Sequence, residues 1–299
     1  MSNLLKLLSP YQTISIIGMG KNVGKTTTLN YLINGFNQNN LQLALTSIGR
    51  DGENIDVVTQ TEKPQIFVMA NTIVITTEKL LAVCDITIEV LQVTDITTPL
   101  GRVVVVRALS AGFVQICGPS ITKQLSGLIK DLQEFNADKI LIDGAISRKS
   151  LASPTLAQSV VLCSGAGLSS NIRDVIDKTR HEVEMFMLPC AEEKDDDIFL
   201  TGAVSDFKMQ ELIFSGINLS DRQIIVDDAT KIFISALTYQ KLLIKRAKLR
   251  VKTPINLVCL TINPVSPRGF AFNSKEFLIQ MRASISIPVY DIVLEEEHV

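Results

Sequence analysis

Short apolar runs alternate with amphipathic stretches along most of this 299-residue chain. Residues 12–17, 41–46 and 139–142 are rich in apolar and β-branched side chains, which is typical of strands in a buried, mainly parallel sheet. Residues 121–135 instead place apolar side chains on one face at helical spacing: Leu125, Leu128, Ile129 and Leu132. This alternation predicts an α/β fold in which helices flank a mainly parallel sheet.

A strand-rich segment between residues 65 and 118 interrupts the alternation. β-Branched runs recur there at residues 72–76, 87–91, 103–107 and 113–117. Pro99 and Gly101 mark a turn between two of these runs. We expect a strand-rich insertion beside the sheet, with one core strand within it.

An acidic run at residues 192–197 predicts a linker between two domains. A second α/β pattern follows it. Its expected strands lie at 222–226, 231–234, 255–261 and 289–293, and its expected helices at 205–214, 236–251 and 274–284. We therefore predict a first domain at residues 1–190, which contains the insertion, and a smaller α/β domain at residues 198–299.

The strongest chemical motif is a glycine-rich loop directly after the first predicted strand: Gly18-Met-Gly-Lys-Asn-Val-Gly-Lys-Thr-Thr-Thr28. A helical pattern follows the loop, and strand, glycine loop and helix in this order are the context of a phosphate-binding loop. Glycines let backbone amides approach an anion, and the helix N-terminus adds partial positive charge. The alternative is a glycine turn with an ordinary surface lysine, which this context disfavours.

The loop predicts that the chain binds ATP and Mg²⁺, although GTP is not excluded by the residues. We expect Lys25 to contact the β and γ phosphates and the Thr26 hydroxyl to ligate Mg²⁺. The expected nucleotide-binding residues are Gly18, Gly20, Lys21, Asn22, Val23, Gly24, Lys25, Thr26 and Thr27.

Acidic residues follow two predicted strands, at the edge where ligands gather in open α/β sheets. Asp143 ends the strand at 139–143, the position of a Walker B acid that polarises a water on Mg²⁺. Asp51, Glu53 and Asp56 follow the strand at 41–46 and are candidate metal ligands, directly or through water. The alternative for each acid is a helix cap or a polar turn. The predicted catalytic residues are Lys25, Asp143 and Asp51, and the predicted metal ligands are Thr26, Asp51, Asp143 and Glu53.

Composition narrows the class of protein further. A formal charge of −2 and a pI of about 5.8 provide no basic field for nucleic acid. The five cysteines are scattered along the chain, which indicates reduced thiols. Only two histidines are present, which disfavours a histidine-based zinc site or a Ser-His triad. No apolar run reaches the roughly 18 residues of a membrane span, and the N-terminus does not resemble a secretory signal. We therefore expect a cytoplasmic protein without a membrane partner.

Basic residues cluster late in the chain, between residues 241 and 252. They are Lys241, Lys245, Arg246, Lys248, Arg250 and Lys252. No aromatic residues alternate with them, as they do at many nucleic-acid sites. We interpret them as the solvated face of a helix, with docking of an acidic partner or of nucleic acid as the alternative.

The glycine loop resembles one branch of the P-loop NTPases. Its first glycine lies one residue further from Gly24 than in the commonest motif, as in the dethiobiotin synthetase and cobyrinic-acid synthase branch, the SIMIBI class. The acid-Gly-Ala at 143–145 and the late strand and glycine turn at 159–170 are also similar, so the resemblance spans roughly residues 12–190. The related ParA and MinD proteins carry a signature lysine at the position of Gly20. The resemblance therefore points away from their lysine-activated dimer, while a homodimer of another kind stays open.

Residues 14–33 and 46–53 also resemble a narrower family, the nucleotide-binding subunit of the lysine 5,6-aminomutase reactivating factor. That resemblance implies an ATPase that acts on a partner enzyme, a cobalamin-dependent aminomutase. One alternative is an ATP-dependent synthetase that activates a small carboxylate, but the substrate lysine usual in such enzymes is missing from residues 46–50, where Arg50 is the basic residue. A second alternative is a nucleotide-gated binding protein with little turnover. We expect nucleotide binding to need only the first domain, and the second domain to contact the partner.

Overall fold

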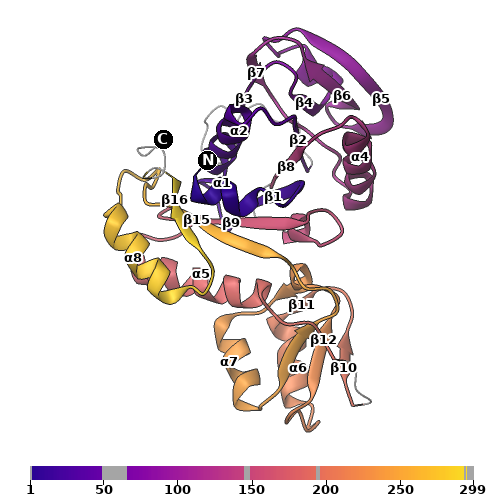
Figure 1. Cartoon of the computed structure of the whole chain (residues 1–299). Helices are drawn as coiled ribbons and strands as arrows, with labels where there is room; N and C mark the ends of the chain where they lie inside the picture. Colours follow the sequence, from indigo (N-terminus) through magenta and orange to yellow (C-terminus); the bar gives the residue numbers. More distant parts are fainter. Residues whose placement is uncertain (1, 49–65, 145–148, 193–195, 293, 295–299) are drawn as a thin grey trace.

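A large sheet organises the chain. The structure is a computed structural model that describes residues 2–48, 66–144, 149–192, 196–292 and 294. Within these residues, a nine-stranded sheet has the order β16-β15-β9-β1-β8-β2-β4-β6-β5 (Figure 1). Its strands are β1 (Thr13–Gly18), β2 (Leu43–Ser47), β4 (Ile73–Thr77), β5 (Ile88–Thr98), β6 (Gly101–Ala108), β8 (Lys139–Asp143), β9 (Ser159–Gly165), β15 (Leu257–Asn263) and β16 (Val289–Asp291).

Seven of these strands run parallel, and helices cover both faces of the sheet (Figure 1). One face packs against α1 (Asn3–Leu8) and α2 (Lys25–Gln38), and the other against α4 (Thr122–Glu134), α5 (Ile172–Phe186) and α8 (Ser274–Ser284). Successive residues of β8 alternate between the two cores, since Leu141 joins the first and Ile140 and Ile142 join the second. The predicted α/β fold with a mainly parallel sheet is confirmed.

The insertion extends the large sheet at one edge. β4 pairs parallel with β2, as expected of a core strand, and β6 and β5 then continue the sheet antiparallel. The prediction that the insertion lies beside the sheet is wrong for β5 and β6, because both strands pair within the large sheet, and Val103–Val106 of β6 are buried in its two cores. The remaining elements are α3 (Glu78–Leu81) and an antiparallel pair, β3 (Ile66–Val68) and β7 (Gly112–Val114).

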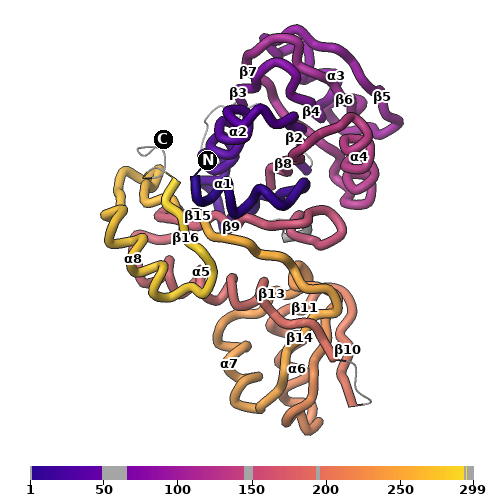
Figure 2. The backbone as a smooth tube through the Cα atoms, viewed as in Figure 1, coloured from indigo at the N-terminus to yellow at the C-terminus, as the bar shows by residue number. Residues whose placement is uncertain are grey.

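A smaller unit follows α5 and forms its own sheet. Its parallel strands are β10 (Ile198–Leu200), β12 (Gln223–Val226) and β14 (Lys248–Val251). It also contains α6 (Asp206–Phe214), α7 (Ala236–Ile244) and the short pair β11 (Val204–Ser205) and β13 (Ile232–Phe233). Figure 2 shows the chain leaving α5 for this unit and returning through β15. Short 3₁₀ turns occur at Lys149–Ala152 and Ala229–Lys231.

The second half of the chain does not form one domain as predicted. β15 pairs with β9, and β16 pairs with β15, so both belong to the large sheet rather than to a unit at residues 198–299. The smaller unit is limited to residues 196–252, and its core continues into the α5 side of the large sheet. β15 is buried along six of its seven residues, which requires neighbours on both faces.

The helix predicted at 236–251 is also wrong at its C-terminal end. α7 ends at Ile244, and Arg246 adopts a left-handed conformation with φ of 58°. The Ala247 amide then donates to the Leu242 carbonyl at 3.0 Å, which closes the helix. Lys248–Val251 continue as β14, so the basic residues between 241 and 252 lie on a helix end, a turn and a strand.

None of the helices in the described parts of the chain is long and apolar enough to cross a membrane.

Candidate functional site

The glycine loop lies at the centre of the large sheet. β1 pairs with β9 on one side and β8 on the other, and ends at Gly18. α2 begins at Lys25, so residues 19–24 form the turn between strand and helix. The strand, loop and helix predicted from the sequence are confirmed, and the loop opens at the carboxyl edge of the parallel strands, where α/β proteins bind ligands.

The backbone of the loop depends on glycine. Gly24 is left-handed, with φ of 92°, and a Cβ there would come within 2.9 Å of the Asn263 Cβ. A Cβ on Gly18 would come within 2.8 Å of the Lys25 side chain. Side chains at these positions would therefore displace the loop or the lysine that lies across it.

The first turn of α2 presents uncapped backbone amides. Gly24 is the N-cap residue and supplies no side-chain hydrogen bond. The Thr28 amide donates to the Gly24 carbonyl at 2.9 Å, whereas no hydrogen bond among the described groups is donated by the amides of residues 24–27. Such amides, together with the helix dipole, form an anion-binding site.

Lys25 is held inside the loop. Its aliphatic chain lies against Gly18, and its ammonium donates to the Gly20 carbonyl oxygen at 2.8 Å. Desolvation lowers the pKa of Lys25 from its usual value, while the nearby Cys163 and Asp143 side chains act in the opposite direction. A desolvated cation with one carbonyl contact can exchange that contact for an anionic oxygen.

Asp143 lies at the same edge of the sheet. It ends β8, which lies between β1 and β2, and pairs in register with Ile16 and Ser47. The next residue fixes this position, since the Gly144 amide donates to the Ile16 carbonyl at 2.8 Å and a Cβ on Gly144 would clash with that oxygen. Thus the structure brings Asp143 and the loop together, as the sequence predicts.

The other predicted acids cannot be placed. Asp51, Glu53 and Asp56, together with Arg50, fall outside the described residues, so their role stays a prediction. No group of three or more His, Cys, Asp or Glu side chains arranged for a metal occurs in the part of the chain that is described. Of the predicted Mg²⁺ ligands, Thr26 and Asp143 are the ones whose positions are known.

Residues outside the loop also support it, and their positions were not predicted from the sequence. A Cβ on Gly167 would come within 3 Å of the Lys21 and Asn22 carbonyl oxygens, and Leu168 lies against Gly20. The glycine turn after β9 is visible in the sequence, whereas its contact with the loop is not. Asn263 lies against Gly24 at the end of β15. The Asn-Pro pair there marks a strand end, yet its place beside the loop depends on the pairing of β15 with β9.

A buried polar cluster lies beneath α2. The Thr28 and Thr261 hydroxyls are 2.9 Å apart, and the Thr261 hydroxyl donates to the Cys163 sulfur at 3.2 Å. Burial is the main cause that raises the pKa of Cys163, so this thiol stays protonated. The cluster connects the first turn of α2 to β9 and β15. A polar residue within an otherwise apolar strand, as Thr261 is, was the available sequence signal.

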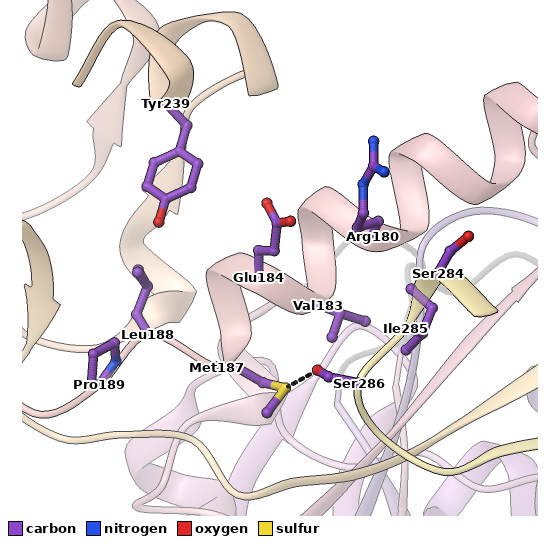
Figure 3. A pocket seen from close by; sticks show the side chains of 10 residues that line it. All are labelled: Arg180, Val183, Glu184, Met187, Leu188, Pro189, Tyr239, Ser284, Ile285 and Ser286. Atoms are coloured by element: carbon purple, nitrogen blue, oxygen red, sulfur yellow. Dashed lines mark hydrogen bonds between the residues drawn. The ribbon is translucent and has the colours of Figure 1, made fainter. Parts of the chain in front are cut away.

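A cavity of about 360 Å³ lies remote from the loop, at the other end of α5 (Figure 3). Val183, Met187 and Ile285 form much of its apolar wall, and the Ser286 hydroxyl donates to the Met187 sulfur at 3.6 Å. Burial, and then Glu184, raise the pKa of Tyr239, which lines the cavity from α7. The cavity shares no residue with the loop and is not part of the candidate site.

Comparison with known proteins does not identify a family. No protein-family description and no curated protein matches this chain. Among solved structures, the chain is similar to the signal recognition particle receptor FtsY from Elizabethkingia anophelis, with 12% identity and a TM-score of 0.29. The match covers 90% of this chain and 65% of that protein. At this level of similarity, no conclusion about function follows from it.

Proposed function

We propose that this chain binds a nucleoside triphosphate together with Mg²⁺ at residues 18–27 and hydrolyses the terminal phosphate. The observation that carries this proposal is the set of uncapped amides at the start of α2, next to the desolvated Lys25 ammonium. Both kinds of donor bind anions, and the glycines at 18 and 24 allow Lys25 and Asn263 to pack closely against the loop backbone. The nucleotide is ATP by sequence resemblance, with GTP as the competing choice.

Backbone amides and the Lys25 side chain both bind the phosphates. The amides of residues 24–27 donate to phosphate oxygens, where the dipole of α2 also favours negative charge. Lys25 gives up the Gly20 carbonyl and donates to a phosphate oxygen, forming a stronger, charge-assisted hydrogen bond. Val23 is buried and anchors the turn.

Two described side chains suit Mg²⁺. The Thr26 hydroxyl and the Asp143 carboxylate are oxygen donors of the kind this ion prefers, and both lie at the carboxyl edge of the sheet. Mg²⁺ supplies charge that offsets the phosphate oxygens when it is bound. Asp143 orients the attacking water, and Asp51 and Glu53 are further candidates from the sequence.

The proposal also concerns the molecule on which the ATPase acts. We favour an ATPase that acts on a partner enzyme, with reactivation of a cobalamin-dependent aminomutase as the candidate. This choice rests on the resemblance of residues 14–33 and 46–53 alone. A synthetase that activates a small carboxylate is the alternative. Phosphate release measured with an aminomutase, or with a panel of small carboxylates, separates the two by which addition stimulates turnover.

Nucleotide titration of Lys25→Ala tests the site itself. Removing a charge-assisted phosphate contact costs about 1.5–3 kcal/mol, so affinity for the triphosphate should fall at least about tenfold. Lys123→Ala is the matched control, because Lys123 is an exposed lysine on α4. Calorimetric titration with ATP and with GTP gives the base preference in the same experiment. Equal affinities of Lys25→Ala and the unchanged protein for the preferred nucleotide would exclude this site.

A further inference from the structure

Exposed apolar side chains concentrate on the small unit. Of the 19 large hydrophobic residues that are exposed in the described chain, eight lie between residues 198 and 244. The most exposed are on α6 and α7, the two helices of this unit. Scattered single residues of this kind are normal on a protein surface, but a continuous group is not.

The exposed residues of α6 form a row. Phe207 and Phe214 are 72% and 73% exposed, and Glu211 lies between them on the same face, since the three are spaced i, i+4 and i+7. Met209 and Ile213 face the core instead. We call this the α6 row: Phe207, Glu211 and Phe214.

Two exposed apolar residues of α7 repeat the spacing of Phe207 and Phe214. Leu237 and Ile244 are 62% and 81% exposed, and the half-buried Lys241 lies between them. Thr238 and Leu242 are the buried residues of this helix. We call this the α7 row: Leu237, Lys241 and Ile244. Both rows therefore read apolar, charged, apolar, with opposite charges at their centres.

The two rows lie side by side at nearly the same height. α6 and α7 each follow a strand of one parallel sheet, and so run in the same direction (Figure 1). Their N-termini are joined, because the Ser235 amide donates to the Asp206 carboxylate at 2.8 Å. Phe207 lies one residue after Asp206, and Leu237 lies two residues after Ser235. The later members of the rows keep this offset of one residue, which is about 1.5 Å along a helix.

The rows border the groove between the helices. The Gln210 amide donates to the Thr238 hydroxyl at 3.5 Å, which shows the faces that the helices turn towards each other. Gln210 is the i+3 neighbour of Phe207, and Lys241 is the i+3 neighbour of Thr238. Neither Glu211 nor Lys241 forms an ion pair within the described residues.

We propose that this surface binds a second copy of the chain. A two-fold axis parallel to the helices places the α6 row of each copy on the α7 row of the other. Phe207 then meets Leu237, Phe214 meets Ile244, and Glu211 meets Lys241, with each contact made twice. An axis perpendicular to the helices would instead bring Glu211 against Glu211 and Lys241 against Lys241, which charge repulsion opposes.

The exposed apolar area of the two rows is comparable to that of a functional patch. The four apolar side chains expose on the order of 500 Å², which lies in the upper part of the range for the largest apolar patch of a monomer, and such patches are often functional. A standard interface buries about 800 Å² on each partner, so these rows would form its centre and their polar neighbours its rim. A uniformly acidic or basic partner would face a like charge in one of the two rows, whereas a second copy matches both. The proposal is independent of the nucleotide site.

Charge exchange in the full-length protein tests the arrangement. Sedimentation velocity should find a dimer of about twice the 32.8 kDa chain mass. Glu211→Lys and Lys241→Glu should each weaken dimerisation about tenfold, because each replaces two ion pairs with two repulsions. The Glu211→Lys/Lys241→Glu double variant should restore the dimer. Ile279→Ser, at an exposed apolar residue of α8, is the control and should leave it unchanged.

Three results would overturn the proposal. The first is a monomer at all concentrations up to about 100 µM, far above the dissociation constant of a specific dimer. The second is a dimer that neither single charge change weakens. The third is a double variant that stays as weak as the single variants, because a surface that binds some other protein would show no such rescue. Circular dichroism of each variant confirms that it is folded.

Discussion

Asp143 illustrates how much one residue depends on its neighbours. Its carboxylate ends a strand that lies between the loop strand and β2, and Gly144 holds it there through the Ile16 carbonyl. Its charge acts on the Lys25 ammonium. An acid in this position can orient a water for attack without itself holding the phosphates.

We therefore expect Asp143→Asn to impair turnover more than binding. The amide keeps the shape of the side chain but loses the charge that orients water and metal. Steady-state phosphate release should fall about a hundredfold or more, the lower end of the range for a group acting in general base catalysis, while the titrated nucleotide affinity changes less. Asp95→Asn, at an exposed position of β5, is the control. Hydrolysis by Asp143→Asn at the rate of the unchanged protein would reduce Asp143 to a turn residue.

The elements of the large sheet could be predicted where burial alone determines the pattern. β1, β8 and β9 are buried nearly throughout, and strands of that kind appear in the sequence as continuous apolar runs. The phosphate loop between β1 and α2 followed from its glycines. Helix α4 followed from apolar residues at helical spacing, and its bounds differ from the predicted range of 121–135 by one residue at each end.

The end of α7 shows why other boundaries could not be predicted. Lys245, Arg246 and Lys248 are good helix formers, so the local composition favours a longer helix. What stops the helix is a left-handed Arg246, without the glycine or asparagine that usually marks such a position. The membership of β15 in the large sheet had no local signal either, because strand pairing is a long-range property.

Arg246→Gly should stabilise the protein. A non-glycine residue in the left-handed region costs roughly 1 kcal/mol, which glycine recovers. The side chain that is lost pairs with Asp221 at 3.4 Å on an exposed surface, where ion pairs contribute little. The free energy of unfolding from urea titration should rise by about 0.5–1 kcal/mol.

Lys245→Gly provides the opposite case. Lys245 is the C-cap of α7 and has right-handed backbone angles, so glycine there adds only flexibility to the unfolded chain. The free energy of unfolding of the Lys245→Gly variant should therefore fall. Equal changes in the two variants would show that backbone conformation at the end of α7 does not control stability.

At the scale of the whole molecule, the two halves of the chain share a sheet and a core. β15 and β16 complete the large sheet beyond β9, and α8 packs on the same face as α5. Asn263 lies against the phosphate loop. The sequence-based expectation that nucleotide binding needs only the first half is therefore no longer supported.

We predict that a chain ending at Pro189 fails to fold. It would lack β15, β16 and α8, and so expose the edge of β9 and one face of the core. Replacing residues 192–252 with a short glycine-serine linker should instead retain nucleotide binding. The linker has only a short distance to span, because the two ends of the small unit are adjacent: the Ala191 amide donates to the Val251 carbonyl at 2.8 Å. Thermal unfolding and nucleotide titration compare the two proteins, and a cooperative, nucleotide-binding Pro189 fragment would contradict the shared core.

One helix spans the distance between the phosphate loop and the small unit. The turn before α5 contacts the loop at Gly167, while near its other end the His181 imidazole bonds to the Ile234 carbonyl at 2.8 Å. A helix of 15 residues is about 22 Å long and nearly rigid. Because of this length, a tilt of the helix by about 5° at its N-terminus moves its C-terminus by about 2 Å. Since His181 bonds to Ile234, a tilt of this size would shift that edge of the small unit by a comparable distance.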